Sequence, residues 1–329
     1  MGIDLQLLQQ LSNGYFYSGE SLAQQLGVSR TTIWKEINRL EELYAVKVQS
    51  VKGRGYRLSQ PLELLDEPRI FTQIPESSRS KLQGIEILPV VDSTNRYLMA
   101  AASRGATTGH VIFAEQQTAG RGRQGRNWVS PFACNIYCSL LWRFEIPTST
   151  LSGLGIVIAV AVERALSNYC TKLQIKWPND ILHESKKLAG ILLEMQGEAN
   201  GPASIVIGVG INIKMPATLP QEIDQAWTDL SQVTGKTVSR NALAADVIHQ
   251  LIQAIQMFEK QGLESFIPAW EAKDLLRGQA IEILLGEKLI NGIARGIDKT
   301  GALQLEIAGE IKSFMAGEAS LRKRSGVSV

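Results

Sequence analysis

Residues 66–273 contain more strand-like segments than helical ones, and this ratio is the strongest constraint on the fold. Short apolar runs typical of strands occur at residues 85–91, 111–116, 135–142, 173–177, 188–195 and 205–213. Helical patterns occur at residues 95–103, 150–169 and 240–261. A doubly wound parallel sheet needs a helical crossover between successive strands. This part of the chain is therefore predicted to be an α+β domain with a mixed sheet.

Residues 1–63 carry a different pattern, dominated by helices. Leucines at helical spacing predict a first helix, and a second is predicted over residues 18–26. Gly27 permits a tight turn, and the side chain of Ser29 can cap a third helix over residues 30–43. Two helices joined by a short glycine turn make a helix-turn-helix, a motif that can place its second helix in the major groove of DNA.

A predicted hairpin follows the third helix. Residues 46–51 and 55–58 have strand character and bracket Lys52-Gly53-Arg54, so the tip of the hairpin is basic. The net charge of the chain is only +2, but residues 44–60 hold basic residues and no acidic one. Such a hairpin is typical of the wing of a winged helix, and its charge favours contact with DNA phosphates.

Residues 274–329 predict a third domain. Their strand segments are short and punctuated by glycines, a pattern typical of a small β-barrel. The predicted strands cover residues 280–285, 290–296, 303–307 and 311–315. The chain of 329 residues is long enough for several domains, which we predict at residues 1–63, 66–273 and 274–329.

Several functional classes are disfavoured by composition. Three cysteines cannot all pair, and neither they nor the isolated histidines show metal-ligand spacing, so no metal site is assigned to protein ligands and a cytoplasmic location is expected. The first residues lack the pattern of a signal peptide. The longest apolar run, residues 151–162, is too short to cross a bilayer. We interpret it as a buried helix and expect no membrane partner.

The most unusual segment is Gly120-Arg-Gly-Arg-Gln-Gly-Arg126, which we call the arginine loop. Ordering such a loop is costly because its charges repel and it has few apolar atoms to bury. A polyanionic ligand would offset both costs, since arginine can bind phosphate through two parallel hydrogen bonds. A solvated hinge or a nonspecific nucleic-acid tether is the alternative. The position of the loop, between a predicted strand and Trp128, favours a ligand site.

A second group of polar residues lies between two predicted strands. Lys176-Trp-Pro-Asn-Asp180 offers a lysine, an amide and a carboxylate, and two lysines follow at residues 186 and 187. A surface turn with solvated lysines would explain either piece alone. Beside the arginine loop, the two pieces form a set of cations with one carboxylate that suits nucleotide chemistry.

Two further segments are compatible with ligand binding. Ser93-Thr94-Asn95 follows a predicted strand and begins a helix, so these residues either cap the helix or bind a ligand, and both roles can hold. Gly208-Val-Gly-Ile-Asn212 lies in an apolar strand, where glycine weakens packing unless something must approach closely.

Together, these motifs resemble those of the biotin protein ligases, and the winged helix in front of them resembles the bifunctional type that also represses the biotin operon. The resemblance covers nearly the whole chain and rests most on the arginine loop, residues 176–180 and Lys187-Leu-Ala-Gly190. It implies a central domain like that of the biotin and lipoate ligases and a C-terminal barrel of the SH3-like type. Gln124 occupies a loop position where the family tolerates variation.

The resemblance also implies the roles of individual residues. Biotin would be bound by Ser93, Thr94, Asn95, Gln117, Arg121, Gly122, Arg123, Trp128, Lys187, Gly190 and Gly208, with Gly190 and Gly208 leaving room for it. ATP and the adenylate would be bound by Arg121, Arg123, Arg126, Lys176, Asn179, Lys187, Asn212 and Trp227. The catalytic residues would be Lys187 and Arg123, as fixed cations, and Asp180, as the base or as a group that orients the attacking amine.

The implied reaction has two steps. The biotin carboxylate attacks the α-phosphate of ATP, bound with Mg²⁺, which gives biotinyl-5'-AMP and pyrophosphate. A lysine of the biotin carrier domain of acetyl-CoA carboxylase then displaces AMP. Biotinyl-5'-AMP would also be the corepressor, promoting a homodimer on operator DNA. The implied DNA contacts are Arg30, Thr31, Thr32, Lys35 and Arg39 on the third helix and Lys52 and Arg54 on the wing.

Two rival functions share parts of this pattern. A sensor that binds a metabolite and regulates transcription without catalysis would not need Asp180 and Lys187 beside an arginine loop. A lipoate-attaching enzyme shares the general architecture, but the winged helix and the Gly-Arg-Gly-Arg sequence disfavour it.

Overall fold

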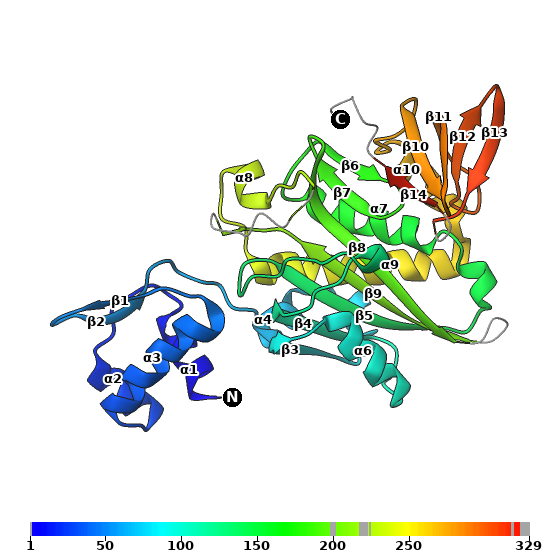
Figure 1. The fold of residues 1–329 in the computed structure, drawn as a ribbon. Helices are drawn as coiled ribbons and strands as arrows, with labels where there is room; N and C mark the ends of the chain where they lie inside the picture. The colour runs from blue at the N-terminus through cyan, green and yellow to red at the C-terminus, as the bar shows by residue number, and fades with distance from the viewer. Residues whose placement is uncertain (1, 198–201, 217–222, 224, 317–318, 323–329) are drawn as a thin grey trace.

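The computed structural model describes residues 2–197, 202–216, 223, 225–316 and 319–322. A small helical part at the N-terminus is followed by a large central part and by a small sheet near the C-terminus (Figure 1). This arrangement confirms the predicted fold class. The boundaries predicted between the three domains stay predictions.

The N-terminal part is three helices followed by a hairpin. Its elements are α1 (Ile3–Leu11), α2 (Gly19–Leu26), α3 (Arg30–Tyr44), β1 (Val48–Val51) and β2 (Gly55–Leu58), and the two strands are antiparallel. Gly27 has a left-handed backbone with φ of 65°, which ends α2. The Ser29 hydroxyl accepts a 3.0 Å hydrogen bond from the Thr32 N–H, which begins α3. The predicted winged helix is confirmed.

The central part is a seven-stranded mixed sheet. Its strands are β3 (Gly84–Val91), β4 (His110–Gln117), β5 (Ile136–Phe144), β6 (Leu173–Lys176), β7 (Asp180–His183), β8 (Lys186–Gly197) and β9 (Ala203–Ile211). They lie in the order β3-β4-β5-β9-β8-β7-β6. The β3 and β4 strands are parallel, and the other neighbouring pairs of described strands are antiparallel. The mixed sheet is therefore confirmed.

Helices cover both faces of this sheet (Figure 1). The α6 helix (Thr94–Ser103) packs on one face, where Leu98 meets apolar residues of β4, β5 and β9. The α7 helix (Leu154–Ser167) and the α9 helix (Arg240–Gln261) pack on the other. The buried helix predicted over the apolar run is α7. It begins at Leu154, later than predicted, because Gly153 has a left-handed backbone with φ of 80°.

Short elements account for the local errors of the sequence-based prediction. Neither β7 nor the C-terminal strand β14 (Ala319–Arg322) was predicted, because a four-residue run gives a weak periodic pattern unless a longer apolar run or a recognisable hairpin turn accompanies it, as at β1, β2 and β6. The same holds for the short helices α4 (Glu67–Gln73), α5 (Glu76–Arg79), α8 (Leu230–Thr234) and α10 (Ile267–Glu271).

The C-terminal part is a small antiparallel sheet. Its strands are β10 (Ala280–Leu285), β11 (Lys288–Ile297), β12 (Leu303–Ile307), β13 (Glu310–Phe314) and β14, in the order β13-β12-β11-β10-β14. Its apolar residues join the core of the central part. The buried indole N–H of Trp177, which follows β6, donates a 3.2 Å hydrogen bond to the carbonyl of Gly301. The segment that leads to Asp180 is thereby attached to this sheet.

The segment between the winged helix and the central sheet is held by buried polar contacts. Glu115 of β4 pairs with Arg240 of α9 at 2.7 Å, and both side chains are almost fully buried. A second oxygen of Glu115 accepts a 2.6 Å hydrogen bond from the Leu65 N–H. In addition, the rings of Tyr44 in α3 and Phe132 lie 4.4 Å apart between centroids. The winged helix is thus packed against the central part as well as joined to it by the chain.

Two expectations about the environment of the chain can be compared with the structure. Cys134, Cys138 and Cys170 are free thiols. In the part of the chain that the structure describes, no helix is both long enough and apolar enough to cross a membrane. The expected cytoplasmic location stays a prediction.

Candidate active site

The site is built on the face of the sheet that α6 covers. Gly190 of β8 lies opposite Gly210 of β9, and Leu192 lies opposite Gly208. A Cβ atom on Gly210 would come within 2.5 Å of the Trp128 side chain, and one on Gly190 within 2.9 Å. The absence of side chains at these two glycines therefore lets the Trp128 indole lie against the sheet.

The room expected at Gly208 is occupied by protein. A Cβ atom there would lie 2.2 Å from the side-chain oxygen of Asn95. Asn95 also accepts a 2.6 Å hydrogen bond from Ser139, and its amide donates to the carbonyl of Leu192 and to Glu194. Its polar atoms are thus engaged by protein groups. Gly208 and Asn95 support the wall of the site in this arrangement.

The start of α6 is tied to the end of β4. The Ser93 hydroxyl accepts a long hydrogen bond of 3.5 Å from the Arg96 N–H, as a helix cap does. Both the N–H and the hydroxyl of Thr94 donate to the Gln117 side-chain oxygen, at 2.9 and 3.1 Å. Ser93 and Thr94 are buried. The structure thus brings Ser93, Thr94 and Gln117 together, and their binding of biotin stays a prediction.

Gln117 connects this helix start to Trp128. Its amide donates to the Ser130 hydroxyl at 3.0 Å, and that hydroxyl donates to the carbonyl of Trp128 at 3.0 Å. The indole N–H of Trp128 is buried and has no hydrogen-bond partner among the described residues. A buried donor without a partner is unfavourable, so this N–H is available to a ligand acceptor.

The arginine loop folds as a short hairpin. The Trp128 N–H donates to the Gly120 carbonyl at 2.9 Å, and the Gly122 N–H donates to the Arg126 carbonyl at 2.7 Å. A 3₁₀ turn, η1 (Arg123–Gly125), forms its tip. Two consecutive residues of this turn have left-handed backbones, with φ of 54° at Gln124 and 73° at Gly125. Gly122 was expected to bind biotin, and its N–H is used within the loop.

The three arginines of the loop have different surroundings. Arg121 is half-exposed and pairs with Glu194 at 2.9 Å. Arg123 donates to the Asn179 side chain at 3.3 Å and to the backbone carbonyl of Ala316. Burial lowers the pKa of the Arg123 guanidinium from its ordinary value, with Asp180 opposing this effect, although arginine stays protonated in proteins. Arg126 is exposed.

Lys187 and Asp180 form the central ion pair of the site. Their charged atoms are 2.9 Å apart, and their side chains are only 16% and 23% exposed. Asp180 begins β7 and lies opposite Gly190 of β8, and an irregularity in the pairing follows at Ile181. The Lys187 ammonium is also 5.3 Å from the centroid of the Trp128 ring. One cation, one carboxylate and the indole therefore meet beside the glycines.

A backbone pairing brings the segment around Trp227 to the same place. The Lys187 N–H donates to the Ala226 carbonyl and the Thr228 N–H donates to the Lys187 carbonyl, both at 3.0 Å. The Asn212 amide donates to the Thr228 carbonyl at 3.1 Å. Asn212 thus holds the segment that carries Trp227. Lys176 lies opposite Asp180 in the β6–β7 pair.

The sequence-based prediction missed four residues of the site. Glu194, Ser130, Ser139 and Gly210 take part in these contacts, as described above. Alternate residues of a strand share a face, so the spacing of Gly190 and Glu194 and of Gly208 and Gly210 was an available signal. The spacing alone does not give the role of these residues, because the groups that they contact lie on other parts of the chain.

The described residues contain no cluster of three or more His, Cys, Asp or Glu side chains that could hold a metal ion. Asp180 is engaged by Lys187.

The predicted DNA-contacting residues lie on two neighbouring elements. Arg30, Thr31, Lys35 and Arg39 are exposed on α3, and Lys52 and Arg54 are exposed at the tip of the β1–β2 hairpin. Thr32 is less accessible, because its hydroxyl is hydrogen-bonded to that of Ser29. The sequence-based prediction missed Trp34, which is 55% exposed in the middle of α3. Arg54 and Arg57 both lie over the ring of Phe16, which stiffens the hairpin.

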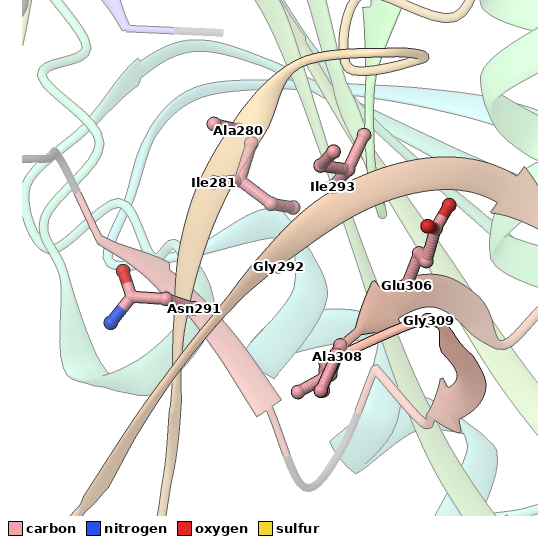
Figure 2. A pocket seen from close by; sticks show the side chains of 9 residues that line it. Ala280, Ile281, Asn291, Gly292, Ile293, Glu306, Ala308 and Gly309 are labelled. Atoms are coloured by element: carbon pink, nitrogen blue, oxygen red, sulfur yellow. The ribbon is translucent and has the colours of Figure 1, made fainter.

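A separate pocket of about 330 Å³ lies on the C-terminal sheet, between β10, β11 and β12 (Figure 2). Its lining is mostly small or aliphatic, with Asn291 and Glu306 as the polar side chains. None of the residues expected to bind biotin or ATP lines it. It is therefore distinct from the candidate active site.

Comparisons with known proteins agree with this architecture. The model described as the Biotin/lipoate A/B protein ligase family matches residues 87–212. The HTH domain matches residues 4–57, and the Biotin protein ligase C terminal domain matches residues 277–322. A solved structure, biotin protein ligase from Aquifex aeolicus in complex with biotin and ATP, is 29% identical with a TM-score of 0.64, and the match covers 74% of this chain and 100% of that one. Fold and site thus define a protein of the biotin/lipoate ligase class.

Full-length relatives narrow the assignment. The bifunctional ligase/repressor BirA of Escherichia coli (strain K12) is 41% identical over 321 residues, which cover 97% of this chain and 97% of that protein. The protein of the same name from Bacillus subtilis (strain 168) is 32% identical, with 96% and 97% covered. The chain belongs to the bifunctional ligase/repressor family. The predicted class of protein is thus confirmed.

Proposed function

We propose that this chain activates biotin with ATP and transfers it to a lysine of the biotin carrier domain of acetyl-CoA carboxylase, and that it also represses transcription of biotin synthesis genes. The observation that carries the catalytic part is the ion pair between Lys187 and Asp180, whose charged atoms are 2.9 Å apart. The Lys187 ammonium also lies near the Trp128 ring, and Arg123 is hydrogen-bonded to Asn179. The Escherichia coli and Bacillus subtilis relatives are named as ligases and repressors, and the Aquifex aeolicus relative was solved with biotin and ATP.

The biotin pocket is assigned to the α6 side of the sheet. The head group would bind near Ser93, Thr94 and Gln117, whose polar groups converge there. The free indole N–H of Trp128 is an additional donor for it. The chain of biotin would then lead along Trp128 toward Lys187, which is 5.3 Å from the indole centroid.

In the first step, the biotin carboxylate attacks the α-phosphate of ATP and pyrophosphate leaves. Negative charge gathers on the phosphoryl oxygens, so fixed cations lower the barrier. Lys187 and Arg123 supply these cations, with Arg121 and Arg126 nearby on the same loop. Lys187 is held by Asp180 and Arg123 by Asn179, so neither cation must be ordered at the moment of reaction. Trp227, which forms an isolated backbone bridge with Lys187, would cover the adenine.

In the second step, the acceptor lysine attacks the mixed anhydride and AMP leaves. A free lysine has a pKa of about 10.4, so its proton must be removed or shifted before attack. Asp180 is our candidate for accepting this proton or for orienting the amine. Mg²⁺ would enter with the phosphates of ATP, since the described residues offer no carboxylate cluster for it.

DNA binding is assigned to the winged helix. The exposed cations of α3 and of the hairpin tip suit contact with a major groove and its flanking phosphates. The unit is small, so operator affinity would come from two copies on a twofold site. Biotinyl-5'-AMP would act as corepressor by favouring that homodimer. By linkage, the dimer then binds the adenylate more tightly than the monomer does.

One assay tests the catalytic proposal directly. The chain is incubated with biotin, MgATP and a biotin carrier domain, and the products are read by mass spectrometry. We expect one added biotin on the carrier domain, with AMP and pyrophosphate formed in equal amounts. Pyrophosphate release without labelled carrier domain would refute the assigned acceptor, and no release at all would favour a sensor without catalysis. Lipoate offered in competition should leave the labelling unchanged.

A further inference from the structure

The turn between β11 and β12 reaches from the C-terminal sheet to the central part. It covers residues 298–302, and its Gly301 carbonyl accepts a 3.2 Å hydrogen bond from the Trp177 indole N–H. The Thr300 carbonyl accepts a 2.7 Å hydrogen bond from the hydroxyl of Ser152, just before α7. One turn of the C-terminal sheet therefore contacts both the segment after β6 and the start of α7.

The turn packs closely against the central part. Gly301 has a left-handed backbone with φ of 83°, and a Cβ atom on it would lie 2.9 Å from the Cα atom of Gly153. The same added atom would lie 3.4 Å from the side chains of Ile156 and Leu263. Trp177 is only 1% exposed, so its indole N–H would be a buried donor without a partner if the Gly301 carbonyl moved away.

Asp298 fixes the shape of this turn. One carboxylate oxygen accepts hydrogen bonds from the Thr300 N–H at 2.8 Å, the Thr300 hydroxyl at 2.6 Å and the Ala302 N–H at 3.2 Å. The Asp298 N–H donates to the Ala302 carbonyl and the Gly301 N–H donates to the Asp298 carbonyl, both at 2.9 Å. Burial acts to raise the pKa of the Asp298 carboxyl, but hydrogen bonds from Thr300 and Ser313 hold it below its ordinary value. The carboxylate form is therefore the one that organises the turn.

Trp177 leads directly into the segment that carries the central ion pair of the site. Asp180 follows three positions later and pairs with Lys187 at 2.9 Å. Between them, the Asn179 carbonyl accepts a 3.2 Å hydrogen bond from the Ile191 N–H of β8. The segment is thus held by the β11–β12 turn at one end and by β8 at the other.

We propose that Asp298 is a positioning residue for this segment. It shapes the β11–β12 turn, and the turn holds Trp177 so that Asp180 meets Lys187. This inference rests on the proposed function, in which Lys187 and Asp180 serve the reaction. A misplaced catalytic group slows the chemical step even when the substrate is bound. The turn therefore contributes to the rate of adenylate formation, whereas biotin is bound by other elements in the proposed pocket.

The test compares Asp298→Ala with Asp298→Asn in the full chain. Alanine removes the hydrogen bonds that the carboxylate accepts, whereas asparagine keeps an oxygen for them. Adenylate formation is measured in a single turnover at saturating biotin and MgATP, and the rate is expressed per active site, counted from the adenylate that stays bound. We expect Asp298→Ala to lower this rate about tenfold, within the roughly 100-fold that a misplacement of about 1 Å can cost.

The conservative variant and the binding measurement give two further expectations. Asp298→Asn should keep the rate within about twofold of the wild type, because the hydrogen bonds of the turn remain. The Kd for biotin, measured by calorimetry without ATP, should change by less than about twofold in both variants, since a positioning effect on the transition state leaves ground-state binding unchanged.

A double-mutant cycle tests whether the effect passes through Trp177. Trp177→Phe keeps a buried ring and removes the N–H that bonds to Gly301. It should lower the rate by itself, and Asp298→Ala should then add little. Glu287→Ala, which changes an exposed carboxylate in the β10–β11 turn of the same sheet, is the matched control and should leave the rate unchanged. Thermal unfolding of each variant gives the temperature below which all of them are folded, and the rates are compared there.

Three results would overturn the inference. An unchanged rate per active site in Asp298→Ala, with or without lower thermal stability, would make Asp298 a purely structural residue. Weaker biotin binding with an unchanged rate would assign it to binding instead. Additive effects of Asp298→Ala and Trp177→Phe would show that Asp298 acts by another route. A wild-type chain that forms no adenylate would refute the proposed function itself, so the two failures can be told apart.

Discussion

Lys187 makes three different contacts within the candidate site. It pairs with Asp180, lies near the Trp128 ring and is bonded through its backbone to the segment of Trp227. The neighbouring Lys186 is exposed on the same strand. Two adjacent lysines of the same hairpin thus have different environments, which makes them a matched pair for substitution.

Lys187→Ala should reduce adenylate formation about 100- to 1000-fold, as expected when one fixed group that stabilises transition-state charge is removed. Pyrophosphate release with biotin and ATP measures this step. Lys186→Ala should change the rate by less than about twofold, as is usual for an exposed residue outside the site. Normal biotin transfer by Lys187→Ala would contradict the assigned role.

Asp180→Asn tests whether this carboxylate serves the second step. If Asp180 accepts a proton from the acceptor lysine, transfer from preformed biotinyl-5'-AMP should slow about 100-fold, the range for lost general-base catalysis. Adenylate formation should fall less, because Lys187 remains present. Single-turnover measurements of the two steps separate these effects. Equal losses in both would indicate that Asp180 only orients Lys187.

At the scale of elements, the residues predicted to contact DNA lie on α3 and on the β1–β2 hairpin. Phe16 lies under Arg54 and Arg57, so the hairpin is held by cation–π contacts as well as by its strand pairing. Lys52, at the exposed tip, has no such restraint. The two kinds of position suit different functions. The arginines packed on Phe16 stabilise the hairpin, whereas the Lys52 side chain can adjust its position to contact a DNA phosphate.

Lys52→Ala should weaken DNA binding to a similar extent for all sequences and reduce the slope of log K against log salt by about 1. Trp34→Ala should instead change the preferred sequence, because an exposed aromatic side chain on α3 can contact bases. Titrations of selected and random duplexes at several salt concentrations distinguish the two outcomes. Lys172→Ala, on the exposed end of the central sheet, is the control for nonspecific charge. An unchanged salt slope for Lys52→Ala would remove the wing from the interface.

At the scale of the whole molecule, the winged helix is joined to the central part by the polypeptide chain and also by side-chain contacts. Phe132, whose ring contacts Tyr44, is two residues from Ser130, whose hydroxyl accepts a hydrogen bond from Gln117 in the candidate site. Glu115 and Arg240 hold the connecting segment at Leu65, within the central part. Truncation before residue 64 would therefore keep the Glu115–Arg240 pair, and it would lose the aromatic contact and the hydrogen bonds that Glu63 accepts from Ser239, Arg240 and Asn241.

A chain that lacks residues 1–63 should retain ligation and lose all specific DNA binding. Loss of the Tyr44 ring exposes Phe132, so we expect biotin affinity to fall by about tenfold or less, which corresponds to about 1.4 kcal/mol. Calorimetry measures the biotin affinity, a labelling assay measures ligation, and footprinting measures specific DNA binding. Protection of a specific DNA site by the truncated chain would show that the winged helix is not the DNA-binding domain.

Local sequence was sufficient for the elements with strong periodicity. The N-terminal helices and the basic hairpin were predicted because caps, turns and apolar spacing act within a few residues. The motif segments were also recognisable, since arginines on glycines and a lysine-asparagine-aspartate turn are unusual in themselves. Short elements such as β7 lack enough residues for a pattern, and their existence depends on neighbouring strands.

The sequence by itself determined the three-part organisation, the mixed central sheet and the residue types of the site. Only the tertiary structure decided which groups meet: Trp128 over Gly190 and Gly210, Asn95 over Gly208, and Glu194 between Asn95 and Arg121. The physical reason is that helix caps and strand periodicity are local, whereas ion pairs and hydrogen bonds across a sheet depend on strand order and register. Residues almost a hundred positions apart, such as Asn95 on α6 and Glu194 on β8, become neighbours because the helix packs on that face of the sheet.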